Sequence, residues 1–257
     1  LRRQRQIGIR DSSINAQDIS NQGILSAAAT GLSDFILHKG ADVDRIFGIS
    51  GINPELLLSP TLSLQLTNYC EVLEQSAKLS HCDNFGLHYG QQFHPKALGL
   101  IGYIGLCSAS LEDALKNMTS HFNLHQKDTL CRMVEVNDAY RFDYQVQHGA
   151  ILSRRQDAEL TVGMFMNVIR EVLGTHYSPR EIHFEHPRPE FWQEHSKLFN
   201  ASVFFDQPFN SILIAKSDLK TAMPQSDPLL LTMMLDTLKI LNTQSQSQSL
   251  TNQVRAH

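Results

Sequence analysis

Hydrophobic residues recur at helical spacing through most of the first half of the chain. The spacing predicts an amphipathic helix over residues 22–39, ended by Gly40, a short helix from Asp42 to Phe47 and a long helix from Thr61 to Leu79. The apolar positions of the first of these helices are Ile24, Leu25, Ala28, Leu32, Phe35 and Ile36. The first half is therefore expected to be helical.

A glycine-rich block follows between Asp83 and Leu115, in which five glycines within twenty residues alternate with large apolar side chains. Each glycine inside a helix costs roughly 1 kcal/mol relative to alanine, so their presence indicates close packing of backbones or a cavity. Ser110 and Asp113 form a Ser-x-x-Asp capping box, which predicts a new helix that runs to Phe122. The glycines concerned are Gly86, Gly90, Gly99, Gly102 and Gly105.

The periodicity changes after His125, where alternating residues predict strands. A hairpin is expected through Asn137 and Asp138, and Ser153 is expected to cap a long helix that Gly174 ends. The remaining elements predicted are strands at 130–136, 140–147, 181–186, 202–205 and 211–215, and a short helix near 190–199. This order predicts an α+β fold, with a helical N-terminal half packed on a small, mostly antiparallel sheet and a long helix between strands.

Several of these segments resemble one known family. They are FGLHYG and LGLIGYIGLCSASLEDAL in the glycine-rich block, HFNLH after it, DRIFGISGINPELLLSPTLSL at 44–64, and HFEHPRPEFWQEHSKLFNASVFFDQPFNSILIAKSDL at 183–219. Together they resemble the N-terminal regulatory domain, of arabinose-binding type, of AraC/XylS bacterial transcription regulators, from about Leu25 to the C-terminus. In that family a domain of two helix-turn-helix units follows, and this chain ends at LTNQVRAH, where its first helix is expected to begin.

The resemblance and the composition together divide the chain into three parts. Residues 1–20 form a polar, basic arm, and residues 21–241 the regulatory domain, with a helical part at 21–125 and a mixed part at 126–241. Asp227 is expected to cap the last helix, from about Leu229 to Leu241. Residues 242–257 include the polar repeat TQSQSQS and are interpreted as a linker to a DNA-binding domain that this chain lacks.

The charge of the chain is unevenly distributed. The net charge is −4, yet the first ten residues hold four arginines and no acid, which leaves 18 basic against 26 acidic residues in the rest. An acidic body is a poor surface for duplex DNA, so DNA binding is expected only through the missing domain. The basic arm either contacts nucleic acid or a partner, or is simply solvated.

Neither a membrane span nor a signal peptide is predicted. No apolar stretch reaches the eighteen or so residues that a transmembrane helix needs, and the basic start of the chain has no apolar segment behind it. We therefore expect a cytoplasmic protein without membrane contact.

Motifs for metals, cofactors and catalysis are not found. Cys70, Cys82, Cys107 and Cys131 form no C-x-x-C pair and are expected to be reduced. His183 and His186 would point to opposite faces of a strand, and His121 and His125 share a helix face but lack the glutamate of H-E-x-x-H. A nucleophile elbow, a P-loop, a dinucleotide fingerprint and an acid/base couple are all missing. The sequence predicts neither an enzyme nor a bound metal or cofactor.

A candidate pocket mixes apolar surface with a few polar groups, the composition of a small-molecule site, although aromatic residues at helical spacing also build ordinary cores. Its candidate lining residues are Tyr103, Cys107, His121, Phe122, His125, Tyr144 and Phe165. The Met-rich segment 231–241 is either part of a homodimer interface, as the resemblance implies, or packed in the core.

These observations lead to one functional hypothesis and one alternative. The chain is expected to be the effector-binding and dimerisation domain of an AraC-type regulator, in which a small molecule binds between the helical half and the sheet and alters DNA binding by the following domain. The alternative is a stand-alone sensor of haem, gas or another small ligand. The sequence does not identify the effector.

Overall fold

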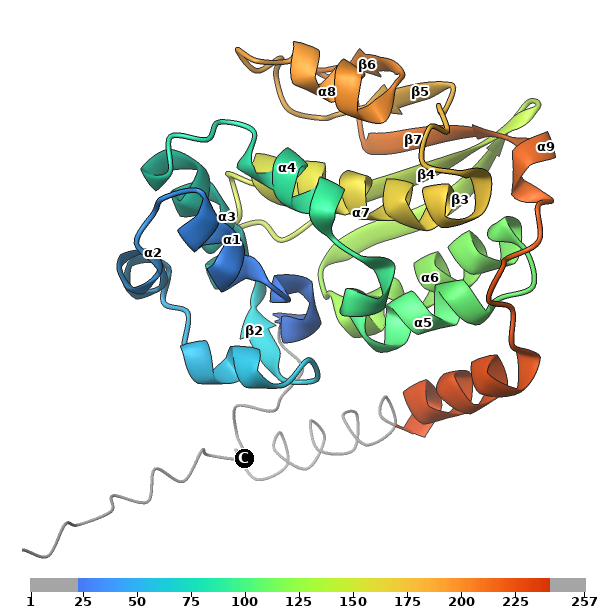
Figure 1. The fold of residues 1–257 in the computed structure, drawn as a ribbon, viewed down its shortest axis with the longest axis horizontal. Coiled ribbons are helices and arrows are strands. Elements are labelled where there is room, and N and C mark those ends of the chain that lie inside the picture. The colour runs from blue at the N-terminus through green and yellow to red at the C-terminus, as the bar shows by residue number, and fades with distance from the viewer. Residues whose placement is uncertain (1–22, 241–257) are drawn as a thin grey trace, which may run out of the picture.

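The computed structural model describes residues 23–240 and has the α+β fold that the sequence predicts (Figure 1). The larger sheet has five strands in the order β3-β4-β7-β5-β6, of which only β5 and β6 run parallel. Its strands are β3 (Thr129–Val136), β4 (Ala139–Val146), β5 (Glu181–His183), β6 (Ser202–Phe204) and β7 (Asn210–Ala215).

One long helix, α7 (Arg155–Leu173), organises the core. It packs against β4 and β7 of the sheet on one side and against α3 and α4 on the other, and Figure 1 shows it crossing in front of the sheet. The other α-helices are α1 (Leu32–His38), α2 (Val43–Ser50), α3 (Leu66–Leu79), α4 (Phe85–Gln92), α5 (Leu100–Cys107), α6 (Leu111–His125), α8 (Gln193–Phe199) and α9 (Lys216–Leu219). Short 3-10 helices are η2 (Ser26–Ala29), η3 (Pro54–Leu58) and η4 (Pro95–Leu98). No helix within residues 23–240 is long and apolar enough to cross a membrane.

The glycine-rich block brings α4 directly onto α7, as its composition predicts. A Cβ atom on Gly86 would lie 2.0 Å from the carbonyl oxygen of Gln156, and one on Gly90 would lie 2.7 Å from that of Leu160. Gly163 faces Gly90 from the α7 side, where a Cβ would lie 3.1 Å from the Gly90 carbonyl carbon. The two helices therefore pack backbone to backbone, which only glycine allows at these positions.

Two of the predicted N-terminal helices are wrong in their first turns. Instead of helix, residues 23–25 form β1 (Gly23–Leu25), which pairs antiparallel with β2 (Ser63–Gln65), and α3 begins only at Leu66. Ile24 also bridges to Gln126 at the end of α6. These long-range backbone pairings outweigh the local helical pattern, which α1 retains from Leu32 onward.

The predicted strand at 181–186 ends at His183, and the helix predicted near 190–199 begins only at Gln193. Two other local predictions are confirmed. Ser110 caps α6 by accepting a hydrogen bond from the backbone nitrogen of Asp113, and Val136 pairs with Ala139 across a turn in which Asn137 has φ 52°. The predicted cap of α7 is wrong, because the residue before its first turn is Arg154 rather than Ser153, without a side-chain cap.

Residues 228–240 form the predicted last helix, and Asp227 caps it by accepting a hydrogen bond of 2.9 Å from the backbone nitrogen of Leu230. One side packs on the core through Leu238, while Leu229 and Met233 remain 72% and 59% exposed. Figure 1 shows this helix at the edge of the molecule, beyond α9. The basic arm at 1–20, Leu241 and the linker at 242–257 lie outside the described residues.

Candidate functional site

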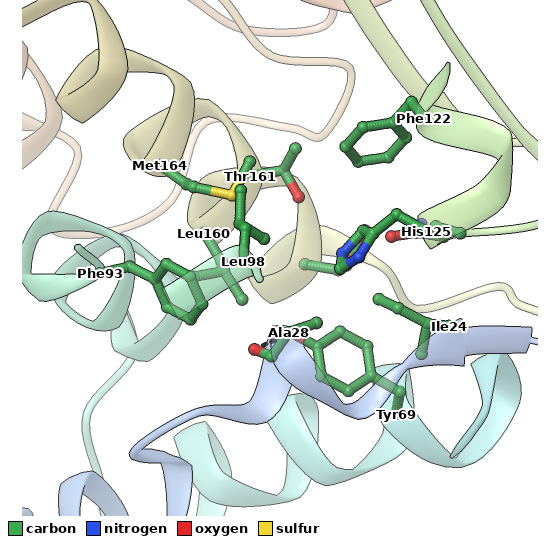
Figure 2. Close-up of a pocket in the computed structure, with 12 residues that line it drawn as sticks. Ile24, Ala28, Tyr69, Phe93, Leu98, Phe122, His125, Leu160, Thr161 and Met164 are labelled. Atoms are coloured by element: carbon green, nitrogen blue, oxygen red, sulfur yellow. Dashed lines mark hydrogen bonds between the residues drawn. The ribbon is translucent and has the colours of Figure 1, made fainter. Parts of the chain in front are cut away.

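A small internal cavity lies where the N-terminal segment meets α3, α6 and α7. Figure 2 shows side chains from these separate parts of the chain converging on it, with the imidazole of His125 reaching toward its middle. Its lining is mainly apolar with a few polar groups: Ile24, Ala28, Tyr69, Phe93, Leu98, Phe122, His125, Gln126, Asp157, Leu160, Thr161 and Met164.

The cavity is nearly closed. The space in which the centre of a water molecule fits is about 10 Å³, which is the room that a single water needs. A larger ligand would require side chains to move apart, and the flexible Met164 is well suited to such a rearrangement.

A chain of hydrogen bonds runs behind the apolar lining. The amide nitrogen of Gln126 donates to the phenol of Tyr144 at 2.7 Å, and Tyr144 donates to Oδ2 of Asp157 at 2.6 Å. Burial raises the pKa of Asp157 to about 7, against the opposing effect of the Tyr144 hydrogen bond, because a buried carboxylate loses its hydration. A carboxyl group with this pKa can either accept or donate a hydrogen bond near neutral pH.

His125 supplies an unused polar group at the cavity. Its side chain is 3% exposed, and burial lowers its pKa to about 4, so the imidazole is neutral at physiological pH. Its Nδ1 atom has no hydrogen-bond partner among residues 23–240. Because an unpaired buried polar atom costs about 1–3 kcal/mol, a ligand that pairs with Nδ1 would recover part of that cost.

The structure brings four of the seven candidate pocket residues together. Phe122 and His125 line the cavity. Tyr144 joins the hydrogen-bond chain, and the rings of Tyr144 and Phe165 lie 5.9 Å from that of Phe122, measured between centroids. These four side chains form the cavity wall and the layer behind it.

The other three candidates lie elsewhere. Tyr103 on α5 is 38% exposed and borders a separate surface hollow of about 550 Å³. Cys107 is buried at the end of α5, where burial raises the pKa of its thiol. His121 is half-buried on α6, and its Nδ1 lies 2.8 Å from the carbonyl oxygen of Asn117.

Sequence reasoning missed the polar residues that α7 and the end of α6 contribute. Gln126, Asp157 and Thr161 were not identified, because polar residues on a helix are ordinarily assigned to its solvent side. Only the spacing of two of these residues along the chain indicates their position. Asp157 and Thr161 are four positions apart, so they share one face of α7 with the apolar Leu160 and Met164 nearby.

The histidines are also arranged in a way that the sequence does not predict. The prediction that His183 and His186 point to opposite faces of one strand is wrong, because β5 ends at His183. His183 lies 2.9 Å from the carboxylate of Glu181 at the end of β5, whereas the chain turns beyond the strand and buries His186 beside Glu159 and His195. The pairing of His186 with His195 depends on tertiary structure and was missed. All four cysteines are free thiols.

Comparisons with known proteins agree on one type of domain. The family profile described as the arabinose-binding domain of AraC transcription regulators, N-terminal, matches residues 40–223. The ornithine utilization regulator of Pseudomonas aeruginosa is 20% identical over 213 residues, which cover 79% of this chain and 60% of that protein. The transcriptional regulator CdpR from Pseudomonas aeruginosa shares the fold, with a TM-score of 0.56 and 14% identity over 79% of this chain and 61% of that chain. This chain thus spans about three fifths of the length of both relatives.

Proposed function

Because the chain belongs to the family of AraC-type transcription regulators, through a domain of the arabinose-binding type, we propose that it senses a small molecule in the cavity beside His125. Occupation of the cavity would then alter DNA binding by a helix-turn-helix segment of the full-length protein. The observation that carries this proposal is the unpaired Nδ1 of His125 at a nearly closed, mainly apolar cavity.

The position of the cavity supports a regulatory role. It is bounded by the N-terminal segment, α3, α6 and α7, so a ligand that enlarges it displaces elements from both halves of the domain. A ligand shifts such an equilibrium only by its difference in affinity for the closed and open states. The closed state has no room for a larger ligand, so such a ligand would bind the open state with higher affinity.

The lining also limits the chemistry of the effector. Apolar side chains suit a mainly hydrophobic body, while His125, Gln126 and Asp157 offer a few directed hydrogen bonds. Asp157 also suits an amino group, which would favour its ionised form. The relative named for ornithine utilization makes ornithine and other amino acids one class to test, beside aromatic and fatty acids.

A thermal-shift screen of these compound classes tests the proposal. A ligand at one hundred times its Kd stabilises the fold by about 2.7 kcal/mol. The shift should be strongly reduced in His125→Gln and retained in the control His121→Gln, whose side chain contacts Asn117 instead of the cavity. An equal shift in the wild type and both variants would show that the ligand binds outside this cavity. Absence of any shift would favour a purely dimerising domain.

The arrangement of the full chain is part of the same proposal. Residues 21–241 would form the regulatory domain, residues 1–20 a basic arm, and residues 242–257 a linker that transmits the conformational change. The exposed face of residues 228–240 would contribute to a homodimer. Sequence-specific DNA binding by residues 1–257 alone, in a gel-shift assay, would contradict this division of labour.

Haem sensing is the alternative that the sequence left open, and its test is spectroscopic. A haem-binding domain would show a Soret band after reconstitution with haem. The effector proposal expects a colourless protein and a melting temperature that haem does not change.

A further inference from the structure

Three buried side chains that the proposed effector site does not use meet on the other side of α7. Glu159 comes from α7, His186 from the segment after β5, and His195 from α8. Nε2 of His195 lies 2.8 Å, and Nε2 of His186 3.4 Å, from Oε1 of Glu159. Candidate ligand atoms of all three residues lie within 4.8 Å of one another.

Their hydrogen bonding is incomplete in a specific way. Oε2 of Glu159, Nε2 of His186 and Nδ1 of His195 are buried without a hydrogen-bond partner among residues 23–240. Nδ1 of His186 lies 2.9 Å from the carbonyl oxygen of Pro187, and a carbonyl oxygen can only accept a hydrogen bond. In the neutral imidazole Nδ1 therefore carries the proton, and Nε2 of His186 directs a lone pair toward the carboxylate. Two acceptors face each other, which a cation between them would resolve.

Two of the three distances between ligand atoms can be compared with those around a tetrahedral ion. Zinc ligands about 2.0–2.2 Å from the metal lie roughly 3.3–3.6 Å from one another at the tetrahedral angle. The 3.4 Å between His186 and Glu159 agrees with that range, while the 2.8 Å contact of His195 would have to open by about half an ångström or more. The hydrogen bond from His186 to Pro187 is the kind of outer contact that orients a metal-binding histidine.

Arg155 is the group that opposes a cation here, because its Nε donates to Oε1 of Glu159 at 2.8 Å. Its remaining guanidinium nitrogens, however, bond to Oδ1 of Asp83 at 3.1 Å and Oδ1 of Asn84 at 2.5 Å. The charge of Arg155 is therefore shared with a second carboxylate, so it only partly neutralises the Oε1 atom that faces the two histidines, while Oε2 has no partner among the described residues.

A surface hollow borders the cluster on the side of His186. This hollow of about 310 Å³ is lined by Arg155, His186 and Pro187, among other residues. An ion would have to enter past His186 from this side, where a water molecule would complete its coordination. A site of two histidines, one carboxylate and an open position is one of the ligand sets in which proteins hold zinc.

We propose that Glu159, His186 and His195 bind one divalent cation of the zinc class, with water in the fourth position. The cation would tie α7, α8 and the segment after β5 together. This site is separate from the cavity at His125, so the proposal does not depend on effector sensing.

Metal titration of the chelator-treated full chain tests the proposal, with Zn²⁺ followed by calorimetry and Co²⁺ by visible absorption. We expect one equivalent to bind and Co²⁺ to show the intense bands of tetrahedral coordination. His186→Gln should weaken binding by at least about tenfold, since even loss of an outer contact costs this much. The matched control His183→Gln changes a neighbouring histidine that pairs with Glu181 and should leave binding unchanged.

X-ray absorption of the zinc-loaded wild type provides a test that does not depend on variants folding. It should show nitrogen and oxygen ligands at about 2.0–2.2 Å, with scattering from two imidazoles. Equal binding by His186→Gln and His183→Gln would overturn the proposal. Failure of the wild type to bind one equivalent would show that the three residues form only a hydrogen-bonded cluster.

Discussion

The phenol of Tyr144 donates a 2.6 Å hydrogen bond to the carboxyl group of Asp157, and both side chains are shielded from solvent. Tyr144 lies on β4 and Asp157 on α7, so this contact ties the sheet to the central helix. It also places a titrating group against the candidate effector cavity. The protonation state of that carboxyl group affects both stability and binding.

Asp157 should make the fold less stable as pH rises. Its pKa increases from an ordinary 3.8 to about 7 on folding, so its contribution to stability is complete below pH 4 and is lost as pH rises through 7. We expect Asp157→Asn to gain stability relative to the wild type between pH 5 and pH 8, on the order of 2–3 kcal/mol. Urea unfolding at both pH values measures this difference. An equal stability difference between the variant and the wild type at the two pH values would contradict the raised pKa of Asp157.

His125 should have the opposite effect on the acid side. Because folding lowers its pKa from 6.5 to about 4, its contribution to stability is present above pH 6.5 and is lost as pH falls through 4. Between pH 7.5 and pH 4.5 the wild type should lose on the order of 2–3 kcal/mol that His125→Gln does not lose. Urea unfolding of the wild type and of His125→Gln at these two pH values measures the loss. An equal loss of stability in both proteins would contradict a buried, neutral imidazole at His125.

Gly86→Ala should destabilise the protein by about 2 kcal/mol or more, because the new Cβ would lie 2.0 Å from the carbonyl oxygen of Gln156 and force α4 from α7. The matched control is Gly48→Ala in α2, where a Cβ meets nothing within 4 Å. That substitution should stabilise the fold by roughly 0.5–1 kcal/mol, since alanine is the better helix former. The denaturant midpoints of the two variants measure both effects. Equal stability of the two variants would show that α4 and α7 do not pack backbone to backbone at Gly86.

The exposed face of residues 228–240 should be needed for dimerisation. Leu229→Glu combined with Met233→Glu should dissociate a homodimer and change monomer stability by no more than about 0.5 kcal/mol, because both side chains are exposed. The control is Leu58→Glu, which changes another exposed apolar side chain, on η3. Light scattering over a range of concentrations gives the mass. A dimer that persists in the double variant would place the interface elsewhere.

Local patterns were sufficient for elements whose signals lie within a few residues. The cap of α6 at Ser110, the Asn137-Asp138 turn and the end of α7 at Gly174 all depend on neighbours in sequence, and all are confirmed. The first turns of the segment at 22–39 were wrong, because Ile24 pairs with Leu64 and bridges to Gln126. Such pairings join residues that no local pattern relates.

The candidate site was predictable only in part for a similar reason. His125 belongs to a recognisable aromatic and histidine motif at the end of α6. Asp157 and Glu159 are ordinary polar positions on a helix until the sheet and α4 pack against that helix and His195 of α8 reaches Glu159. Burial changes their chemistry, and burial depends on the tertiary fold.

Asp157 and Glu159 are separated by a single residue on α7, yet their side chains lie in two different places. Asp157 lines the cavity at His125, and Glu159 belongs to the cluster with His195. The backbone contacts at Gly86 and Gly90 leave little freedom for α7 to move independently of α4. A ligand that displaced α7 from one side would therefore act on the contacts on its other side. If an effector changed cation affinity in this way, thermodynamic linkage would require the cation to change effector affinity by the same factor.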